Sequence, residues 1–158
     1  MSERRVVITG IGCVTALSES PTEMFERICK AESGISLIES FDTSEFTVKI
    51  GGEVKGFDVS NYLGHREGKR MDRFTQMALA SAIQAVQDSG LDLETEDKDR
   101  IGVIIGSGIG GLQEIEDQHE KLLVKGPRRV SPFTVPKLMG NAASGCVSIH
   151  FELRGPNM

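Results

Sequence analysis

The pattern of apolar and polar positions predicts strands that alternate with helices. Two short apolar runs rich in β-branched residues, 5–9 and 101–105, each end in a glycine turn and are typical of strands buried on both faces. Ser20, Pro21 and Glu23 supply an N-cap, a proline at the first helical position and a glutamate at the third, which predicts a helix start. The chain therefore opens as strand, glycine loop and helix, with Gly34 beyond the helix end.

Three further helices are indicated by apolar residues at three- and four-residue steps. The first runs from Met71 to Val86 and stops at Gly90. The second ends at Gly126-Pro127, and one of its faces carries Leu112, Ile115, His119, Leu122 and Leu123. The third covers residues 137–153, where small residues favour close approach of another backbone.

The segments between these elements are less regular. Residues 35–55 predict a surface excursion with one or two short strands, and residues 128–136 predict an ordered turn. Strands alternating with amphipathic helices indicate an α/β layered fold with a largely parallel sheet. Two clear strands against four helices indicate that part of the sheet is missing.

Composition narrows the class of protein. The chain has 158 residues and a formal net charge of −5, which argues against nucleic-acid binding and against anionic membranes. Residues 1–5 lack the apolar core of a signal peptide, and no run approaches the ~18 apolar residues of a membrane span. We therefore expect a cytoplasmic protein that binds neither nucleic acid nor membrane. The three cysteines, Cys13, Cys29 and Cys146, are widely spaced and are expected to be small buried side chains rather than disulfides or zinc ligands.

A glycine motif offers a first functional hypothesis. Gly106, Gly108 and Gly111 match G-x-G-x-x-G between a predicted strand and a predicted helix, the setting of a dinucleotide-binding loop. Ser131 stands about twenty residues on, where such a site has an acid for the ribose. The alternative is a glycine-lined turn beside a cavity or a tight helix contact.

Two polar constellations have competing interpretations. His150 follows Cys146 by one helical turn, as a metal pair or a thiolate–imidazole pair requires, but no further ligands are near, so we expect core packing and no metal site. His65 and His119 are expected to face solvent. The basic cluster of an otherwise acidic chain is either a solvated face or a docking surface for an acidic protein, and it comprises Arg66, Lys69, Arg70 and Arg73.

Five segments, in order and with matching gaps, carry a family resemblance over nearly the whole chain. They are RVVITGIGCVT from residue 5, KRMDRF from 69, IIGSGIGGL from 104, RVSPF from 129 and LRGPN from 153. Together they resemble the N-terminal part of the β-ketoacyl-acyl-carrier-protein synthases, close to the synthase II branch of fatty-acid elongation.

The resemblance implies a thiolase-like fold, a layered α/β/α structure with a mixed, mostly parallel sheet. Residues 1–158 would form an incomplete N-terminal half, cut before the strand that carries the nucleophile. The family forms homodimers and needs no cofactor. A cysteine accepts the acyl chain from acyl carrier protein, two histidines assist decarboxylation of malonyl-carrier protein, and the carbanion attacks the acyl thioester. Such a thiolate needs a helix N-terminus, and the oxyanion needs backbone donors.

The same resemblance assigns roles to individual residues. No cysteine or histidine of this chain occupies a catalytic motif, so the chain by itself is expected to be an inactive piece of an acyltransferase. Ile109 matches the gate of the acyl pocket, and Phe133 matches the residue that lines the dimer partner's pocket. Arg66, Lys69 and Arg70 match positions that dock the carrier protein. Departures from the family pattern occur at Gly140, Gly145 and Cys146.

Two other functions stay open at the level of sequence. One is a non-catalytic chain-length-determining subunit of a polyketide synthase, in which glutamine replaces the nucleophile. The other is a nucleotide-dependent oxidoreductase built on the glycine motif. We also expect the isolated chain to aggregate or to remain molten, because a half-fold without its central strands exposes an apolar sheet edge.

Overall fold

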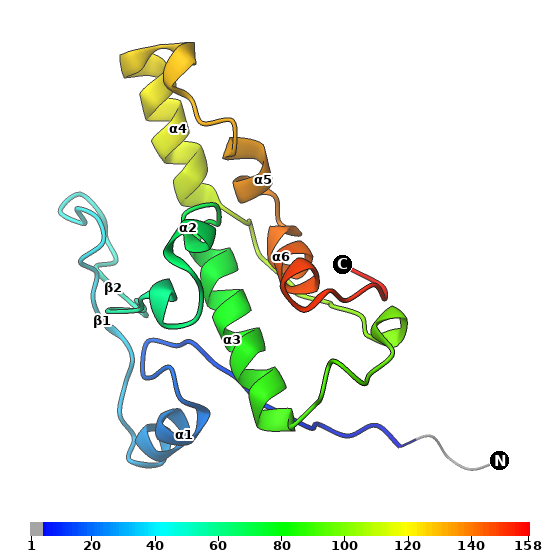
Figure 1. The fold of residues 1–158 in the computed structure, drawn as a ribbon. Coiled ribbons are helices and arrows are strands. Elements are labelled where there is room, and N and C mark those ends of the chain that lie inside the picture. The colour runs from blue at the N-terminus through cyan, green and yellow to red at the C-terminus, as the bar shows by residue number, and fades with distance from the viewer. Residues whose placement is uncertain (1–4) are drawn as a thin grey trace. The chain divides into compact units, whose positions relative to one another are not determined.

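The computed structural model describes residues 5–158, with the side chain of His65 outside the described part (Figure 1). The expectation of a solvent-facing His65 and the signal-peptide argument on residues 1–4 therefore lie outside what it describes. The chain divides into two compact units, Met1–Asp58 with Ala80–Gly90, and Val59–Leu79 with Leu91–Met158. Each unit is described separately.

In the first unit, α1 (Pro21–Cys29) begins where the sequence predicts it. Ser20 is the N-cap, and its side chain accepts a hydrogen bond from the Glu23 backbone N–H at 3.4 Å. In a capping box the Glu23 carboxylate would accept from the Ser20 backbone N–H. Here it accepts from the Ser18 hydroxyl at 2.7 Å, and the Ser20 N–H donates to that same hydroxyl at 2.9 Å. Ala31, with φ of 56°, turns the chain away directly after the helix.

The predicted surface excursion contains one small antiparallel sheet. Its strands are β1 (Ser36–Leu37) and β2 (Ile50–Gly51), with Ser36 opposite Gly51 and Leu37 opposite Ile50. Beyond the strands, the Glu53 carboxylate accepts backbone hydrogen bonds from Glu39 at 2.8 Å and Ser40 at 3.0 Å. The prediction for residues 35–55 is thus confirmed.

The first glycine turn lies against the second half of α3 (Arg73–Ser89), whose end at Gly90 is confirmed. A Cβ at Gly12 would collide with the carbonyl oxygen of Ser81, so only glycine allows this approach. Two side chains of the helix hold the passing backbone: Asp88 accepts from the Ile11 N–H and Gln84 from the Cys13 N–H, both at 2.9 Å.

The predicted strand at residues 5–9 is not observed. Val6 and Ile8 are 91% and 84% exposed, and no residue in the described part of the chain pairs with this segment. A β-branched run becomes a strand only when a neighbouring strand supplies its hydrogen bonds, so the apolar pattern alone does not form one.

The second unit is mainly helical. Within it, α4 and α5 lie side by side, yellow and orange in Figure 1. Its elements, apart from the start of α3, are η1 (Val59–Asn61), α2 (His65–Gly68), η2 (Lys98–Arg100), α4 (Leu112–Lys125), η3 (Pro127–Arg129), α5 (Thr134–Leu138) and α6 (Ala142–Phe151).

Two predictions for the C-terminal part need correction. Residues 137–153 are not one helix, because Met139 is extended (ψ 133°) and separates α5 from α6. Residues 128–136 are not merely a turn, since η3 and the start of α5 lie there. In α6, Ser144 is fully buried, whereas a Cβ at Gly140 or Gly145 would meet open space. Ala143 and Ser144 therefore make the close contacts, and the glycines do not.

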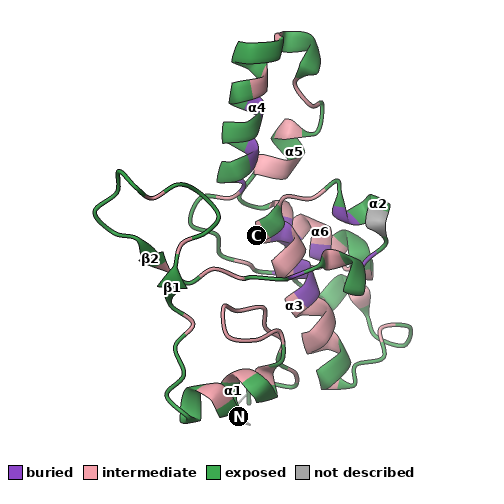
Figure 2. Cartoon of the chain, turned by 90° about the vertical axis from the view of Figure 1, so that its left-hand side faces the viewer, coloured by how far each residue is buried: buried purple, intermediate pink, exposed green. Residues whose placement is uncertain are grey.

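The apolar face predicted for α4 is the exposed one. Leu112, Ile115 and Leu122 are 45%, 41% and 43% exposed, while the residues that α4 buries are Glu114 and Gln118. Figure 2 shows these buried positions on the side of the helix toward α5. Polar contacts therefore orient α4 within this unit.

The predicted strand at residues 101–105 is observed only as a single parallel bridge. Val103 makes a parallel bridge with Asn157, and its backbone is bonded to Pro156 and Met158 at 2.8 and 3.0 Å. The parallel direction agrees with the predicted sheet, although the layered sheet itself is incomplete in this chain. None of the helices described here combines the length and apolar character needed to cross a bilayer.

Candidate functional site

The second glycine turn packs through its last two glycines. Gly110 has φ of 76°, and its N–H donates to the Ser107 hydroxyl at 3.0 Å. The Gly111 N–H donates to the Leu138 carbonyl at 3.1 Å, and a Cβ at either glycine would collide with the backbone of residues 137–140. By contrast, Gly106 and Gly108 face open space. These contacts favour a tight helix contact over the nucleotide-binding interpretation.

The two side chains expected to line the acyl pocket are both presented on the surface of the second unit. Ile109, at the tip of the glycine turn, is 66% exposed. Phe133 is 46% exposed and caps the start of α5, where its N–H donates to the Ser131 hydroxyl at 3.1 Å. Both side chains are therefore exposed on this unit instead of being enclosed in its core.

The three residues expected to dock a carrier protein lie in α2 and directly after its end. Arg66, Lys69 and Arg70 are exposed and make no ion pair with any residue the structure describes. Two contacts of Gly68 hold this segment in place. Gly68 packs against Val59, and the Gly68 carbonyl accepts a hydrogen bond from the Gln76 side chain at 2.8 Å. The structure thus presents three cations on a fixed turn.

The motif at the end of the chain is anchored on α6. The Asn157 amide donates to the Ser144 carbonyl at 2.9 Å and to the Ser148 hydroxyl at 2.6 Å, and its oxygen accepts from the Ser144 hydroxyl at 3.0 Å. Gly155 lies so close to Ile101 that a Cβ would be 2.5 Å from its carbonyl oxygen. Sequence reasoning missed Ser144 and Asn157, although the LRGPN motif contains Asn157.

An exposed ion pair precedes this anchor. The Arg154 guanidinium donates to Asp99 at 2.5 Å, and this hydrogen bond lowers the pKa of the Asp99 carboxyl below its ordinary value. A lowered pKa means that the contact is present above the ordinary aspartate pKa and is lost as pH falls through the folded-state pKa.

We expect Asp99 to titrate at a more acidic pH than an ordinary aspartate. Arg154→Ala should raise the midpoint to the ordinary range, while Arg128→Ala, at an exposed arginine away from Asp99, should leave it in place. Titration of the side-chain carboxyl by NMR measures both. An unchanged midpoint in Arg154→Ala would contradict the assignment.

Cys146 and His150 do not form a reactive pair. Burial, and then the charge of Glu67, raises the pKa of the Cys146 thiol, which disfavours the thiolate. His150 Nδ1 lies 3.7 Å from Glu67 Oε1. Burial also raises the pKa of Cys13. Cys29 is exposed, and Cys13 and Cys146 are only partly buried, so the expected burial is wrong for Cys29 and partial for the other two. His150 is exposed, so the expected core packing is wrong for this residue. His119 is exposed, as expected.

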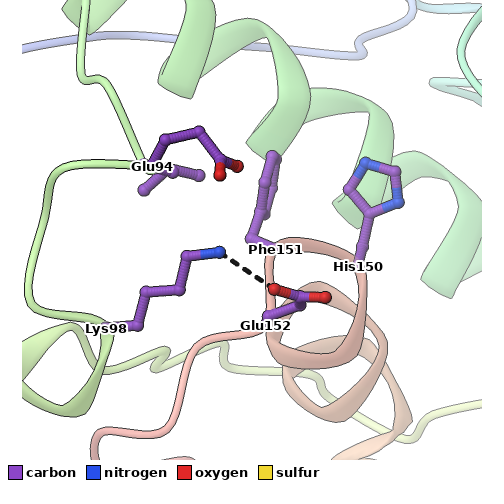
Figure 3. Close-up of a pocket in the computed structure, with 6 residues that line it drawn as sticks. Glu94, Lys98, His150, Phe151 and Glu152 are labelled. Carbon is purple, nitrogen blue, oxygen red and sulfur yellow. Dashed lines mark hydrogen bonds and ion pairs between the residues drawn. The ribbon is translucent and has the colours of Figure 1, made fainter.

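A hollow of about 260 Å³ lies beside His150, and Figure 3 shows its lining. The Lys98 ammonium pairs with Glu152 at 3.0 Å across it, which leaves Glu94 as the other carboxylate. Within residues 5–158, no three His, Cys, Asp or Glu side chains are grouped to hold a metal ion. The hollow thus contains an internal ion pair between Lys98 and Glu152.

Comparison with known proteins decides the family. The family described as "Beta-ketoacyl synthase, N-terminal domain" matches residues 3–158. The chain belongs to the β-ketoacyl synthase family. A 3-oxoacyl-[acyl-carrier-protein] synthase 2 from Vibrio cholerae is 46% identical over 158 residues, which are all of this chain and 38% of that protein. The chain thus spans well under half the length of this β-ketoacyl synthase.

Solved structures show the same fold at lower identity. The ishigamide ketosynthase/chain length factor has a TM-score of 0.89 at 24% identity, covering 99% of this chain and 40% of its own. The ketosynthase AntDE, solved with the carrier protein AntF, has a TM-score of 0.76 at 21% identity. The match covers 96% of this chain and 40% of the AntDE chain. The thiolase-like fold and the partial N-terminal half expected from the sequence are therefore confirmed.

Proposed function

We propose that this chain is the N-terminal part of a 3-oxoacyl-acyl-carrier-protein synthase of fatty-acid elongation, an acyltransferase. The single observation that carries the proposal is the 46% identity, over the whole chain, to a relative that bears this name. The full-length enzyme, meaning this chain extended to the length of its relatives, would condense an acyl thioester with malonyl-carrier protein and release carbon dioxide.

Chemistry in the full-length enzyme requires groups beyond the described residues. The thiols of Cys13 and Cys146 have raised pKa values, and neither follows a strand-to-helix turn that would favour a thiolate. This chain would instead supply Ile109 and Phe133 to the acyl pocket. It would also supply the Asn157 anchor, which holds the chain at the approach to the proposed nucleophile strand.

The proposed partner is an acidic acyl carrier protein, docked on Arg66, Lys69 and Arg70. Support comes from their exposure, from the absence of ion pairs to them in the described part of the chain, and from the AntDE structure, in which an acyl-carrier protein is in complex with its ketosynthase. We further propose a homodimer that works in the cytoplasm. The exposure of Phe133 is consistent with a role in a partner's pocket.

The proposal predicts a defined product. We expect purified full-length enzyme to act on a carrier protein loaded with an acyl chain and on malonyl-carrier protein. It should release carbon dioxide and form a 3-oxoacyl-carrier protein whose chain is two carbons longer than the acyl substrate, as mass spectrometry would show. The 158-residue chain alone is the matched control and should form none. Absence of product from folded full-length enzyme would overturn the proposal and favour a non-catalytic subunit.

A further inference from the structure

An ion pair between a buried glutamate and a partly buried lysine links α4 to α5. Glu114 lies in the first turn of α4 and is 8% exposed, and its Oε2 lies 3.3 Å from the ammonium of Lys137 on α5. The other carboxylate oxygen of Glu114 is buried with no hydrogen-bond partner in the described structure. A charged pair with one contact thus occupies a position where a helix ordinarily places an apolar side chain.

Such a pair is a poor source of stability. Removing two charges from water costs more than one contact returns unless the remaining lone pairs are also satisfied, and apolar residues of similar volume are often as stable or more so. The penalty nevertheless selects geometry, because any arrangement that separates Glu114 from Lys137 leaves a buried charge uncompensated. The pair therefore specifies how α5 lies along α4.

The ion pair is the middle one of three ties that close the α4–α5 hairpin, residues 112–138. The first tie joins the backbones just before the hairpin and at its end, and the third joins a buried amide to a backbone N–H. In order they are Gly111 N–H to the Leu138 carbonyl at 3.1 Å, Lys137 to Glu114 at 3.3 Å, and Ser131 N–H to Gln118 Oε1 at 2.9 Å.

These ties connect the two proposed pocket side chains. Ile109 lies two residues before the first tie, and Phe133 lies between the residues bound by the second and third. Because Lys137 N–H also donates to the Phe133 carbonyl at 3.1 Å, a shift of Lys137 moves Phe133 directly.

We propose that Glu114 and Lys137 are positioning residues that set how far Phe133 reaches into the acyl pocket of the dimer partner, and thereby which acyl chain lengths the enzyme accepts. The inference rests on the proposed function. The Glu114–Lys137 pair would then act on substrate specificity, although it contributes little to stability.

The test uses full-length enzyme and straight-chain acyl thioesters of short, medium and long chain. We expect Glu114→Gln, Lys137→Met and the apolar double variant Glu114→Leu/Lys137→Met each to change the ratio of kcat/KM between long and short substrates by about tenfold, since sub-ångström misplacement of a substrate costs rate steeply. Glu116→Gln, at an exposed glutamate on the same helix, is the matched control and should keep the parental ratio.

The outcomes separate the two proposals. Parent enzyme without condensation activity overturns the proposed function and this inference with it. Active parent, with folded variants whose kcat/KM falls by one common factor for every chain length, overturns the positioning role alone. If all three variants unfold, the pair is a stability element and the positioning role is likewise overturned.

Discussion

Reversing the charges at Lys69 and Arg70 should raise the KM of the full-length enzyme for carrier-protein substrates by about tenfold or more, because like charges placed against an acidic partner cost several kcal/mol. The residues are exposed beside α2 and have no ion-pair partner among the described residues, so a reversal breaks no internal contact seen there. Steady-state kinetics with malonyl-carrier protein and with malonyl-coenzyme A measure the effect. Use of the small thioester should change little.

The matched control reverses two exposed lysines elsewhere, Lys30→Glu with Lys49→Glu, which changes the net charge by the same amount. Added salt should narrow the difference between the parent and the Lys69→Glu/Arg70→Glu variant, because screening weakens exposed charges. Equal loss with both thioesters would show that the reversal damages the enzyme itself. In that case the docking assignment fails.

Gly110→Ala should destabilise the full-length enzyme by about 2–4 kcal/mol, because a residue with a Cβ pays about 1–2 kcal/mol at positive φ and this Cβ also displaces packed backbone. The φ of Gly110 is 76°, and the atoms met would be the Leu138 carbonyl and the backbone of Gly140. Chemical denaturation with matched slopes measures the difference. Activity should fall as well, since the displaced segments carry both proposed pocket residues.

Gly106→Ala and Gly108→Ala are the matched controls from the same motif. A Cβ at either position meets open space, so both variants should unfold near the parental midpoint. A nucleotide-binding loop predicts a larger effect at Gly106 and Gly108 than at Gly110, because the first two belong to its motif and Gly110 does not. Parental stability in Gly110→Ala, or a large loss in Gly106→Ala and Gly108→Ala, would contradict the packing account.

Several elements were predictable because local chemistry determines them. A proline and a serine cap begin α1, and the apolar period carries α3 to its stop at Gly90. The short strands of residues 35–55 also follow from local alternation. Capping, helical periodicity and glycine stops act over a few residues, so they survive whatever lies around them.

Other predictions were wrong where the outcome depends on distant neighbours. Residues 5–9 have the composition of a buried strand and lack a pairing strand in the described chain, so they stay extended and exposed. Residues 137–153 have one helical period, yet Met139 breaks it between two elements that pack separately. The docking and pocket assignments remain proposals, because residue type shows chemistry without showing what faces it.

By itself, the sequence determined the family, through five ordered segments that no single motif could identify, and it determined the local starts and stops of α1 and α3. The tertiary structure alone decided which face of α4 is buried, since the apolar face is exposed and Glu114 meets Lys137. The hydrogen bonds between Asn157 and Ser144 were likewise visible only in the tertiary structure. Hydrogen bonds and ion pairs between residues far apart along the chain depend on how the elements pack, and amino-acid periodicity carries no record of that packing.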